Sequence, residues 1–230
     1  MSSKRWLAGC AVAVSALLAA GCGGGTGSGS APGAAALARQ MRSAIRNATS
    51  VHVSGTAAGN GQQVHLNLSL TRAGGMSGTV ALGQAQVTIL VTGGKAYTKL
   101  TPSALSAMHL PISTCGTFCN KYLVLPASDA AGLTGGMGWS QLMNPSTFSG
   151  TARPGTKVTG PFTINGQQAW KVSDSSGTGY VAAHGPAYPL RIIAPRGQGP
   201  GQIDFTQWNS ATIPGSPPAS QQVTLSQLHG

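Results

Sequence analysis

The sequence predicts an α+β fold: a curled antiparallel sheet with an N-terminal helix and a helical and loop insert that covers the concave face. Three observations support this prediction. One early segment has apolar residues at helical spacing, about ten later segments alternate apolar and polar residues, and this alternation is lost over roughly 45 residues between them. Thr, Val and Gln between Gly-rich breaks also favour strands and turns over long helices. A sheet with so many strands curls or closes, so its concave face needs an apolar cover.

Residues 1–22 have the pattern of a bacterial lipoprotein signal peptide. Lys4 and Arg5 form a short basic region, and an uncharged apolar stretch follows to Ala20. Ala20-Gly21-Cys22 supplies small residues at a cleavage site, so Cys22 would become the N-terminus and carry the lipid anchor, with palmitate among its acyl chains. The apolar stretch is too short to remain as a membrane span. We therefore expect an extracytoplasmic protein anchored through Cys22 to the outer face of the plasma membrane.

Two alternatives stay open for this N-terminal segment. Leu7-Ala8-Gly9-Cys10 matches the usual lipoprotein cleavage motif more closely, but it leaves no room for an apolar stretch before the cut. An ordinary secretory signal followed by an incidental Cys22 would export the chain without a lipid.

The composition fits one exported domain. After Cys22, 208 of the 230 residues follow, enough for a substantial core. This mature chain has 12 Lys and Arg (14 less two) against three aspartates, a formal charge of +9. The basic residues are scattered singly, without runs or interleaved aromatics, so we expect no nucleic-acid partner. A diffuse positive field suits anionic lipid headgroups or acidic wall polymers, although a merely solvated basic surface has the same composition.

A tether and a helix open the mature chain. Residues 23–33 are rich in Gly and Ser and form a flexible tether. The next segment, residues 34–48, is predicted to be a helix because its apolar residues recur at helical spacing. These residues are Leu37, Met41, Ile45 and Ala48. Packing on the sheet is the simplest role for this stripe, and a basic helix lying on the membrane is the alternative.

Strands are expected on both sides of the insert. Those before it span residues 51–53, 64–71, 76–82, 85–91 and 95–100, and those after it span 158–164, 168–173, 179–183, 190–194 and 202–208. Asn165-Gly166 is a strong hairpin signal, and the short links favour a meander of antiparallel neighbours. The domain is expected to cover residues 34–210, with residues 211–230 as a Pro-rich C-terminal tail.

The insert, residues 104–148, supplies the residues expected to line a cavity. It lacks strand periodicity, which indicates short helices and loops, and Thr101-Pro102 has the pattern of a helix start just before it. The candidate lining residues are Leu105, Met108, Leu133, Met137, Trp139, Leu142 and Met143.

Several short segments together carry a family resemblance. They are Ser50-Val51-His52-Val53, Lys171-Val172-Ser173, Gly179-Tyr180-Val181, Tyr188-Pro189-Leu190-Arg191, Gly201-Gln202-Ile203-Asp204-Phe205, Trp208-Asn209 and Pro217-Pro218. With the lipidated cysteine and tether, this order resembles the LolA-like superfamily of lipoprotein carriers, and more closely its LppX/LprG branch of exported lipoproteins. The resemblance implies helices closing a half-barrel around an apolar cavity for the acyl chains of lipids or lipoglycans. Burial of each methylene there would contribute about 0.8 kcal/mol.

Cys115 and Cys119 are the other two cysteines of the mature chain. Outside the cytoplasm such a pair is expected to form a disulfide that closes a small loop. A metal site suits the pair less well, because no histidine pair stands nearby at ligand spacing.

No catalytic or metal-binding pattern is complete in the sequence. Gly138-Trp139-Ser140 begins like the nucleophile elbow of a hydrolase, but Leu142 stands where its final glycine belongs. Three aspartates and no glutamate leave almost no paired carboxylates, and the five histidines are isolated. We expect a monomer that is no enzyme and binds no cofactor or metal.

The leading hypothesis is therefore a lipoprotein that binds lipid acyl chains and carries lipid or lipoglycan through the envelope. One alternative is a non-catalytic surface or sensor lipoprotein with the same fold and no cargo. The other is an envelope hydrolase built on Ser140, which needs a histidine close to that side chain.

Overall fold

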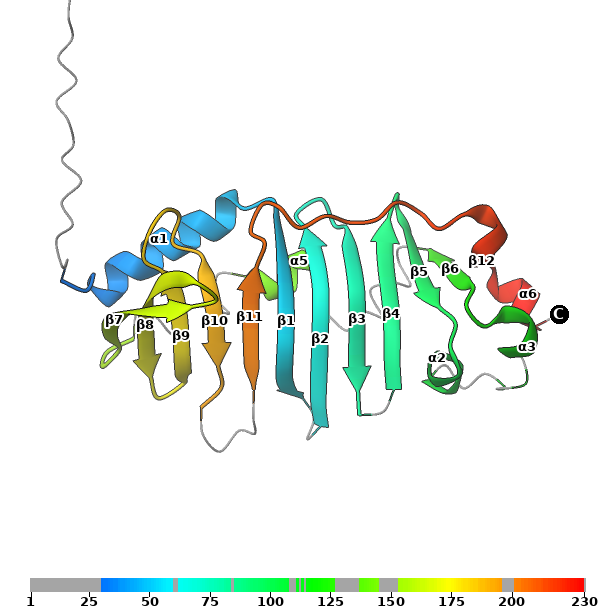
Figure 1. Ribbon diagram of the computed structural model, residues 1–230, viewed down its shortest axis with the longest axis horizontal. Helices are drawn as coiled ribbons and strands as arrows, with labels where there is room; N and C mark the ends of the chain where they lie inside the picture. The colour runs from blue at the N-terminus through cyan, green and yellow to red at the C-terminus, as the bar shows by residue number, and fades with distance from the viewer. Residues whose placement is uncertain are drawn as a thin grey trace, which may run out of the picture. The chain divides into compact units, whose positions relative to one another are not determined.

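The computed structural model describes residues 30–59, 62–83, 85–107, 111, 113, 115–126, 137–144, 153–195 and 201–229. All of these except Ser30 belong to one compact unit. Its described part contains a single twelve-stranded sheet with helices, which confirms the α+β prediction (Figure 1).

Two antiparallel meanders lie side by side in this sheet. The first contains β1 (Ser50–Gly59), β2 (Gln62–Thr71), β3 (Met76–Leu82), β4 (Ala85–Thr92), β5 (Lys95–Lys99) and β6 (Tyr122–Pro126). The second contains β7 (Lys157–Ile164), β8 (Gln167–Asp174), β9 (Gly177–Ala182), β10 (Pro189–Ile193) and β11 (Gln202–Thr206). They join where β1 pairs with β11, with Val53 opposite Phe205. The sheet is open, with β7 and the short β12 (Gln222–Val223) at its edges, which is consistent with half of a barrel.

The alternating sequence of the strands assigns their side chains to two faces. On β2, Leu66, Leu68 and Leu70 are buried, whereas His65 and Asn67 are exposed. Because successive strand residues point to opposite faces, the leucines define an inner, apolar face. The register continues this face across the sheet, since Leu68 lies opposite Val53 on β1.

Helix α1 (Ala34–Asn47) covers the inner face beside the short α5 (Trp139–Leu142), and Figure 1 shows both behind the strands. Leu37, Met41 and Ile45 are each 2% exposed and belong to the main core cluster. This burial supports packing on the sheet as the role of the apolar stripe. The helix ends one residue before the predicted boundary, where the Ala48 amide donates to the carbonyl oxygen of Ala44 at 3.0 Å.

Two glycines allow close approach of neighbouring strands. Gly55 on β1 has φ +140°, and a Cβ there would lie 2.0 Å from the carbonyl oxygen of Gln202. Gly78 on β3 has φ +146°, and its Cβ would lie 1.9 Å from the carbonyl oxygen of Asn67. No L side chain fits either position without displacing the adjacent strand.

A second core cluster lies on β5, β6 and β12, where helices α2 (Pro102–Ala107), α3 (Cys115–Phe118) and α6 (Leu225–His229) also lie. Its buried members are Ala96, Leu100, Leu105, Leu123, Leu125 and Val223. Cys115 and Cys119 are bonded to each other and pack against this cluster. Thr101 Oγ1 accepts a hydrogen bond from the Ala104 amide at 3.1 Å, which caps α2 at the predicted position.

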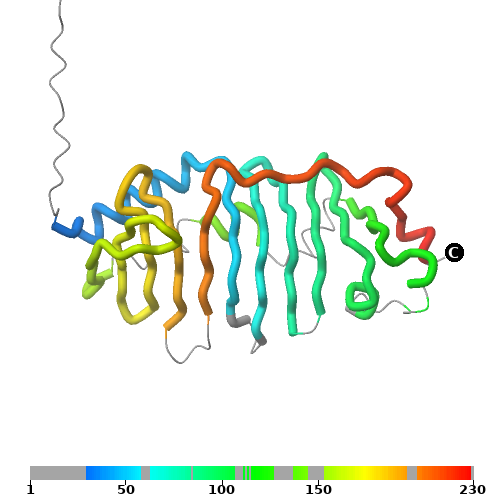
Figure 2. The backbone as a smooth tube through the Cα atoms, in the orientation of Figure 1, coloured from blue at the N-terminus to red at the C-terminus, as the bar shows by residue number. Residues whose placement is uncertain are grey.

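The C-terminal segment lies along the sheet in the same compact unit as the strands. Figure 2 shows the chain after β11 passing along one end of strands β1 to β5 toward the sheet edge formed by β12. Ser216 accepts a hydrogen bond from the Tyr97 hydroxyl at 3.0 Å, and β12 then pairs with β6 in parallel. Neither β6 nor β12 was predicted, because a five-residue strand within a Gly-rich and Pro-rich insert and a two-residue strand leave too short a pattern.

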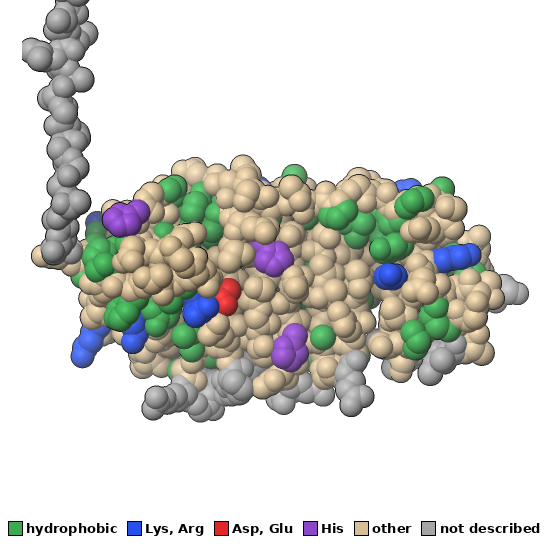
Figure 3. All heavy atoms as spheres, in the orientation of Figure 1, with side chains coloured by type: hydrophobic (Ala, Val, Ile, Leu, Met, Phe, Trp, Pro, Cys, Tyr) green, Lys and Arg blue, Asp and Glu red, His purple; other side chains and the backbone are tan. Residues whose placement is uncertain are grey.

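The outer face of the sheet is polar over β1 and β2, whereas a smaller apolar cluster that includes Ala169 and Ala182 lies on the outer face of β8 and β9. Figure 3 shows histidines and an adjacent pair of basic and acidic side chains on this face, with hydrophobic side chains gathered toward the two ends of the view. Arg191 and Asp204 form a salt bridge there. His52 Nδ1 lies 3.1 Å from Ser69 Oγ, and partial burial lowers the pKa of His52 below its ordinary value.

Candidate functional site: a hollow beneath the N-terminal helix

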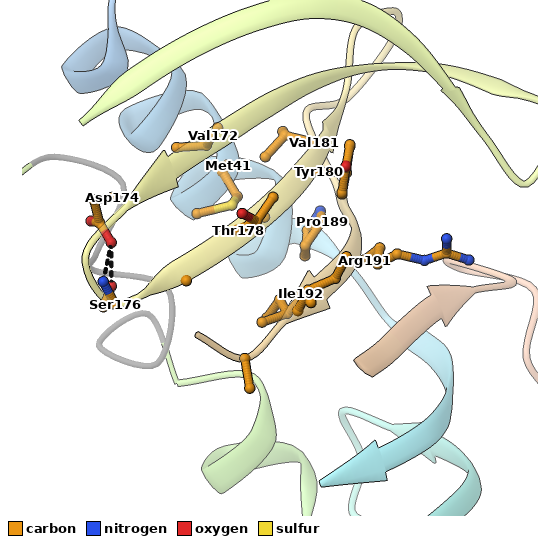
Figure 4. Close-up of a pocket in the computed structure, with 14 residues that line it drawn as sticks. Met41, Val172, Asp174, Ser176, Thr178, Tyr180, Val181, Pro189, Arg191 and Ile192 are labelled. Carbon is orange, nitrogen blue, oxygen red and sulfur yellow. Dashed lines mark hydrogen bonds between the residues drawn. The ribbon is translucent and has the colours of Figure 1, made fainter. Parts of the chain in front are cut away.

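A hollow of about 140 Å³ lies at the inner face of β8, β9 and β10, next to α1. Its apolar lining includes Met41, Val172, Val181, Pro189 and Ile192. Figure 4 shows Met41 reaching from α1 toward the strands, while the Arg191 side chain extends away from the hollow. The hollow is thus a gap between the helix layer and the sheet.

Missing side chains on β9 create this gap. Gly179 lies directly opposite Val172 on one neighbouring strand and Ile192 on the other. Both neighbours belong to the apolar core, so Gly179 occupies an inner-face position. Among the residues that the structure describes, a Cβ at Gly179 would have one neighbour within 4 Å, the Arg191 carbonyl oxygen at 3.9 Å, so it would point into space that these residues leave open.

The β8–β9 turn gives one part of the lining a polar character. Asp174 Oδ1 accepts hydrogen bonds from the side chain and the backbone amide of Ser176, the latter at 2.7 Å. These hydrogen bonds, with a smaller contribution from the positive charge of Arg153, lower the pKa of Asp174. The carboxylate is therefore ionised at neutral pH and places a negative charge beside the apolar lining.

A second hollow, of about 240 Å³, lies at the C-terminal end of α1. It is lined by Ile45, Arg46, Arg72, Trp139 and Met143. Ile45 and Met143 are buried in the main core, and Trp139 packs against it. This hollow combines an apolar interior with two cations.

The structure divides the predicted lining residues among several places. Met143 is buried in the main core, and Met137, Trp139 and Leu142 pack against that core. Leu105 instead belongs to the second cluster, so it does not line the hollow beneath α1. Met108 and Leu133 lie outside the described residues. Among the described residues, the 140 Å³ hollow is lined by β8–β10 and Met41 of α1, and none of its lining comes from the described part of the insert.

The sequence contained a signal for this hollow that the list of candidates omitted. Gly179-Tyr180-Val181 was singled out as part of the family resemblance, and in an alternating strand a glycine beside an outward tyrosine occupies an inward position. A glycine on the apolar face of a strand has no side chain to pack against the layer above it, so it can leave a cavity there.

Other chemically active groups lie elsewhere. Ser140 Oγ donates a hydrogen bond to Gln141 Oε1 at 2.7 Å, while His52 and His65 contact Ser69 and Thr56. Within the described ranges, no three His, Cys, Asp or Glu side chains cluster as a metal site. The same ranges contain no helix that is long and apolar enough to cross a membrane.

Comparison with solved structures identifies the fold class. LprF from Mycobacterium bovis superposes with a TM-score of 0.54 at 16% sequence identity, over 81% of this chain and 99% of LprF. The Mycobacterium tuberculosis lipoprotein LppX gives a TM-score of 0.49 at 18% identity, over 80% of this chain and 98% of LppX. No family model and no curated protein matches the sequence. The match to LprF confirms the predicted resemblance at the level of the fold.

Proposed function

We propose that this protein is an extracytoplasmic lipoprotein, anchored through Cys22 to the outer face of the plasma membrane, that binds lipid acyl chains between α1 and the inner face of the sheet. It is a non-catalytic carrier that holds lipid or lipoglycan as it passes through the envelope. The hollow at Gly179 is the observation that supports this function, because it is an apolar space between two packed layers.

The size of the hollow determines how a lipid enters. Its volume of about 140 Å³ resembles that of engineered cavities of ~150 Å³ that take a benzene molecule. Pockets that enclose a larger ligand measure roughly 300–1,000 Å³. A complete acyl chain therefore fits only if the cover moves, and α1 is the covering element.

The attachment of α1 permits such a movement. Hydrogen bonds hold its C-terminal end, where an Arg72 guanidinium nitrogen donates to the Ile45 carbonyl oxygen at 2.9 Å. Leu37 and Met41, nearer its start, are held by apolar packing. Exposing these two side chains costs about 1.5–3 kcal/mol each, whereas ten buried methylenes contribute about 8 kcal/mol. Burial of the acyl chain therefore offsets the free energy lost when Leu37 and Met41 are exposed.

The position of α1 in the chain also suits a membrane source of lipid. The tether of residues 23–33 separates Cys22 from α1 and has a root-mean-square span of about 18 Å. The covering helix is thus the first element of the described structure after the anchor. A net charge of +9 on the mature chain favours approach to anionic membranes.

Native mass spectrometry of the exported Cys22→Ser full chain tests this function, because any added lipid mass then comes from bound and not covalent lipid. Protein from a lipid-containing bacterial host is expected to carry one lipid-sized addition. Bare protein in repeated preparations, in gentle buffer, would count against lipid binding. It would favour the second candidate, a surface or sensor module without cargo, for which the small volume of the hollow is the supporting observation.

A further inference from the structure

The hollow at the C-terminal end of α1 has a different chemistry from the one at Gly179. Arg46 and Arg72 share its lining with Ile45, Trp139 and Met143. The last three side chains belong to the main core or pack on it, so the hollow opens toward the apolar interior. Two cations at such an opening match an amphiphile with an anionic head.

The Arg72 guanidinium is held in place by two contacts. One of its nitrogens donates to the Ile45 carbonyl oxygen at 2.9 Å, and its central carbon lies 5.7 Å from the centroid of the Trp139 ring. A guanidinium has five N–H donors in a planar fork, so most remain for another acceptor. A group already oriented by a carbonyl and an aromatic ring loses little conformational freedom when it binds a phosphate.

Carboxylates do not neutralise this pair within the described part of the chain. The acidic residues there are Asp174 and Asp204. Asp204 forms a salt bridge with Arg191, and Asp174 is hydrogen-bonded to Ser176 in the β8–β9 turn. The Gly179 hollow therefore has a carboxylate beside it, whereas this second hollow has two guanidinium groups. That difference in charge favours an anionic head group at Arg46 and Arg72 over one at the Gly179 hollow.

We infer that Arg46 and Arg72 bind the phosphate group of a phospholipid whose acyl chains enter the core past Trp139 and Met143. This inference rests on the proposed lipid binding and adds the class of lipid. Arginine pairs suit this role because each guanidinium can form two parallel hydrogen bonds to phosphate oxygens. The acyl chains supply the apolar burial, and the phosphate supplies the selectivity.

Competition between two lipids with the same tails tests the inference. The full-length protein in a neutral detergent is titrated with dioleoylphosphatidylglycerol and with dioleoylglycerol, which lacks the phosphate. We expect a preference for the phospholipid of roughly tenfold, as charge-assisted hydrogen bonds confer. The preference should decrease in high salt, which screens exposed charges.

Two variants test whether Arg46 and Arg72 cause the preference for the phospholipid. Arg46→Gln should reduce it severalfold while dioleoylglycerol binding stays the same, and Arg72→Gln should also reduce the preference severalfold. Arg39→Gln is the matched control, since Arg39 is also exposed on α1 but does not line this hollow. Arg46 is exposed and has no role in the helix-end hydrogen bond, so Arg46→Gln remains informative if Arg72→Gln loosens α1.

The outcomes separate this inference from the proposed function. Equal affinity for both lipids in the unaltered protein, or an Arg46→Gln variant with full preference, overturns the phosphate site and leaves acyl binding intact. Failure of both lipids to bind overturns the proposed function itself. Soluble glycerol 3-phosphate that competes as well as the phospholipid would show a phosphate site independent of lipid, which also contradicts the inference.

Discussion

Filling the Gly179 hollow should weaken lipid binding without weakening the fold. Gly179 sits at an inner-face position, and its backbone is outside the positive-φ region. A Cβ there has one neighbour within 4 Å in the described part of the chain, at 3.9 Å. Replacement by Ala, Val or Leu therefore adds one, three or four carbons to an open space. Because these carbons occupy the place of the acyl chain, affinity should fall in the order Ala, Val, Leu.

The volume of the hollow sets the size of the effect. Filling an apolar cavity contributes about 24 cal/mol per Å³, so the 140 Å³ hollow corresponds to about 3 kcal/mol. Gly179→Leu should then weaken acyl-chain binding by up to roughly 100-fold. Gly179→Ala adds one of the four carbons of leucine, so it should lose about a quarter of this free energy and weaken acyl-chain binding about fourfold. The unliganded Gly179→Leu protein should melt no lower than wild type, because it buries more apolar surface and loses the flexibility of glycine when unfolded.

Two assays check this prediction. Fluorescence titration with a conjugated polyene fatty acid measures the acyl-chain affinity of each variant, and thermal melting measures its stability. Gly215→Leu is the matched control, since Gly215 is exposed and none of the described residues lies within 4 Å of a Cβ built there. A folded Gly179→Leu variant with wild-type affinity would show that the acyl chain does not occupy this hollow, and would refute the reasoning.

Three further predictions concern stability. Gly55→Ala places a Cβ 2.0 Å from the Gln202 carbonyl oxygen, so chemical denaturation should show a loss of about 2 kcal/mol or more. Replacing Cys115 and Cys119 together by Ser should lower the free energy of unfolding by about 2 kcal/mol, and lipid titration should be unchanged because the pair packs on the second cluster. Burial lowers the pKa of His52, so the unfolded state binds more protons below about pH 6.5 and stability decreases as the pH falls. Unfolding curves at about pH 7.5 and 5.5 should show a smaller decrease for His52→Gln; an equal decrease would exclude this residue as the cause.

Local pattern was enough to predict most elements of the fold. The strands around Leu66 and the helix containing Met41 follow from apolar residues at periods of two and 3.6, which depend only on neighbouring residues. The pairing of β1 with β11 does not follow, because nothing in the alternation of Val53 specifies a partner as distant in the chain as Phe205. Similarly, β12 becomes a strand only through its pairing with β6.

The candidate site was harder to predict than the fold, because it also depends on which distant segments pair. A cavity depends on which inward position lacks a side chain, and that is decided by the register that places Gly179 opposite Val172 and Ile192. The second hollow depends on contacts between Arg72 and both Ile45 and Trp139, which join three separate segments. Large apolar residues of the insert were easier to recognise, but one of them, Leu105, packs in the second core cluster and not beneath α1.

Photocrosslinking with a diazirine-bearing fatty acid tests most directly where hydrocarbon binds. After irradiation and proteolysis, the adducts are expected on α1 and on β8–β10, with Met41, Val172 and Ile192 among the labelled residues, and they should decrease in Gly179→Leu. Adducts confined to the polar outer face, or spread evenly over the protein, would contradict binding between the helix and the sheet.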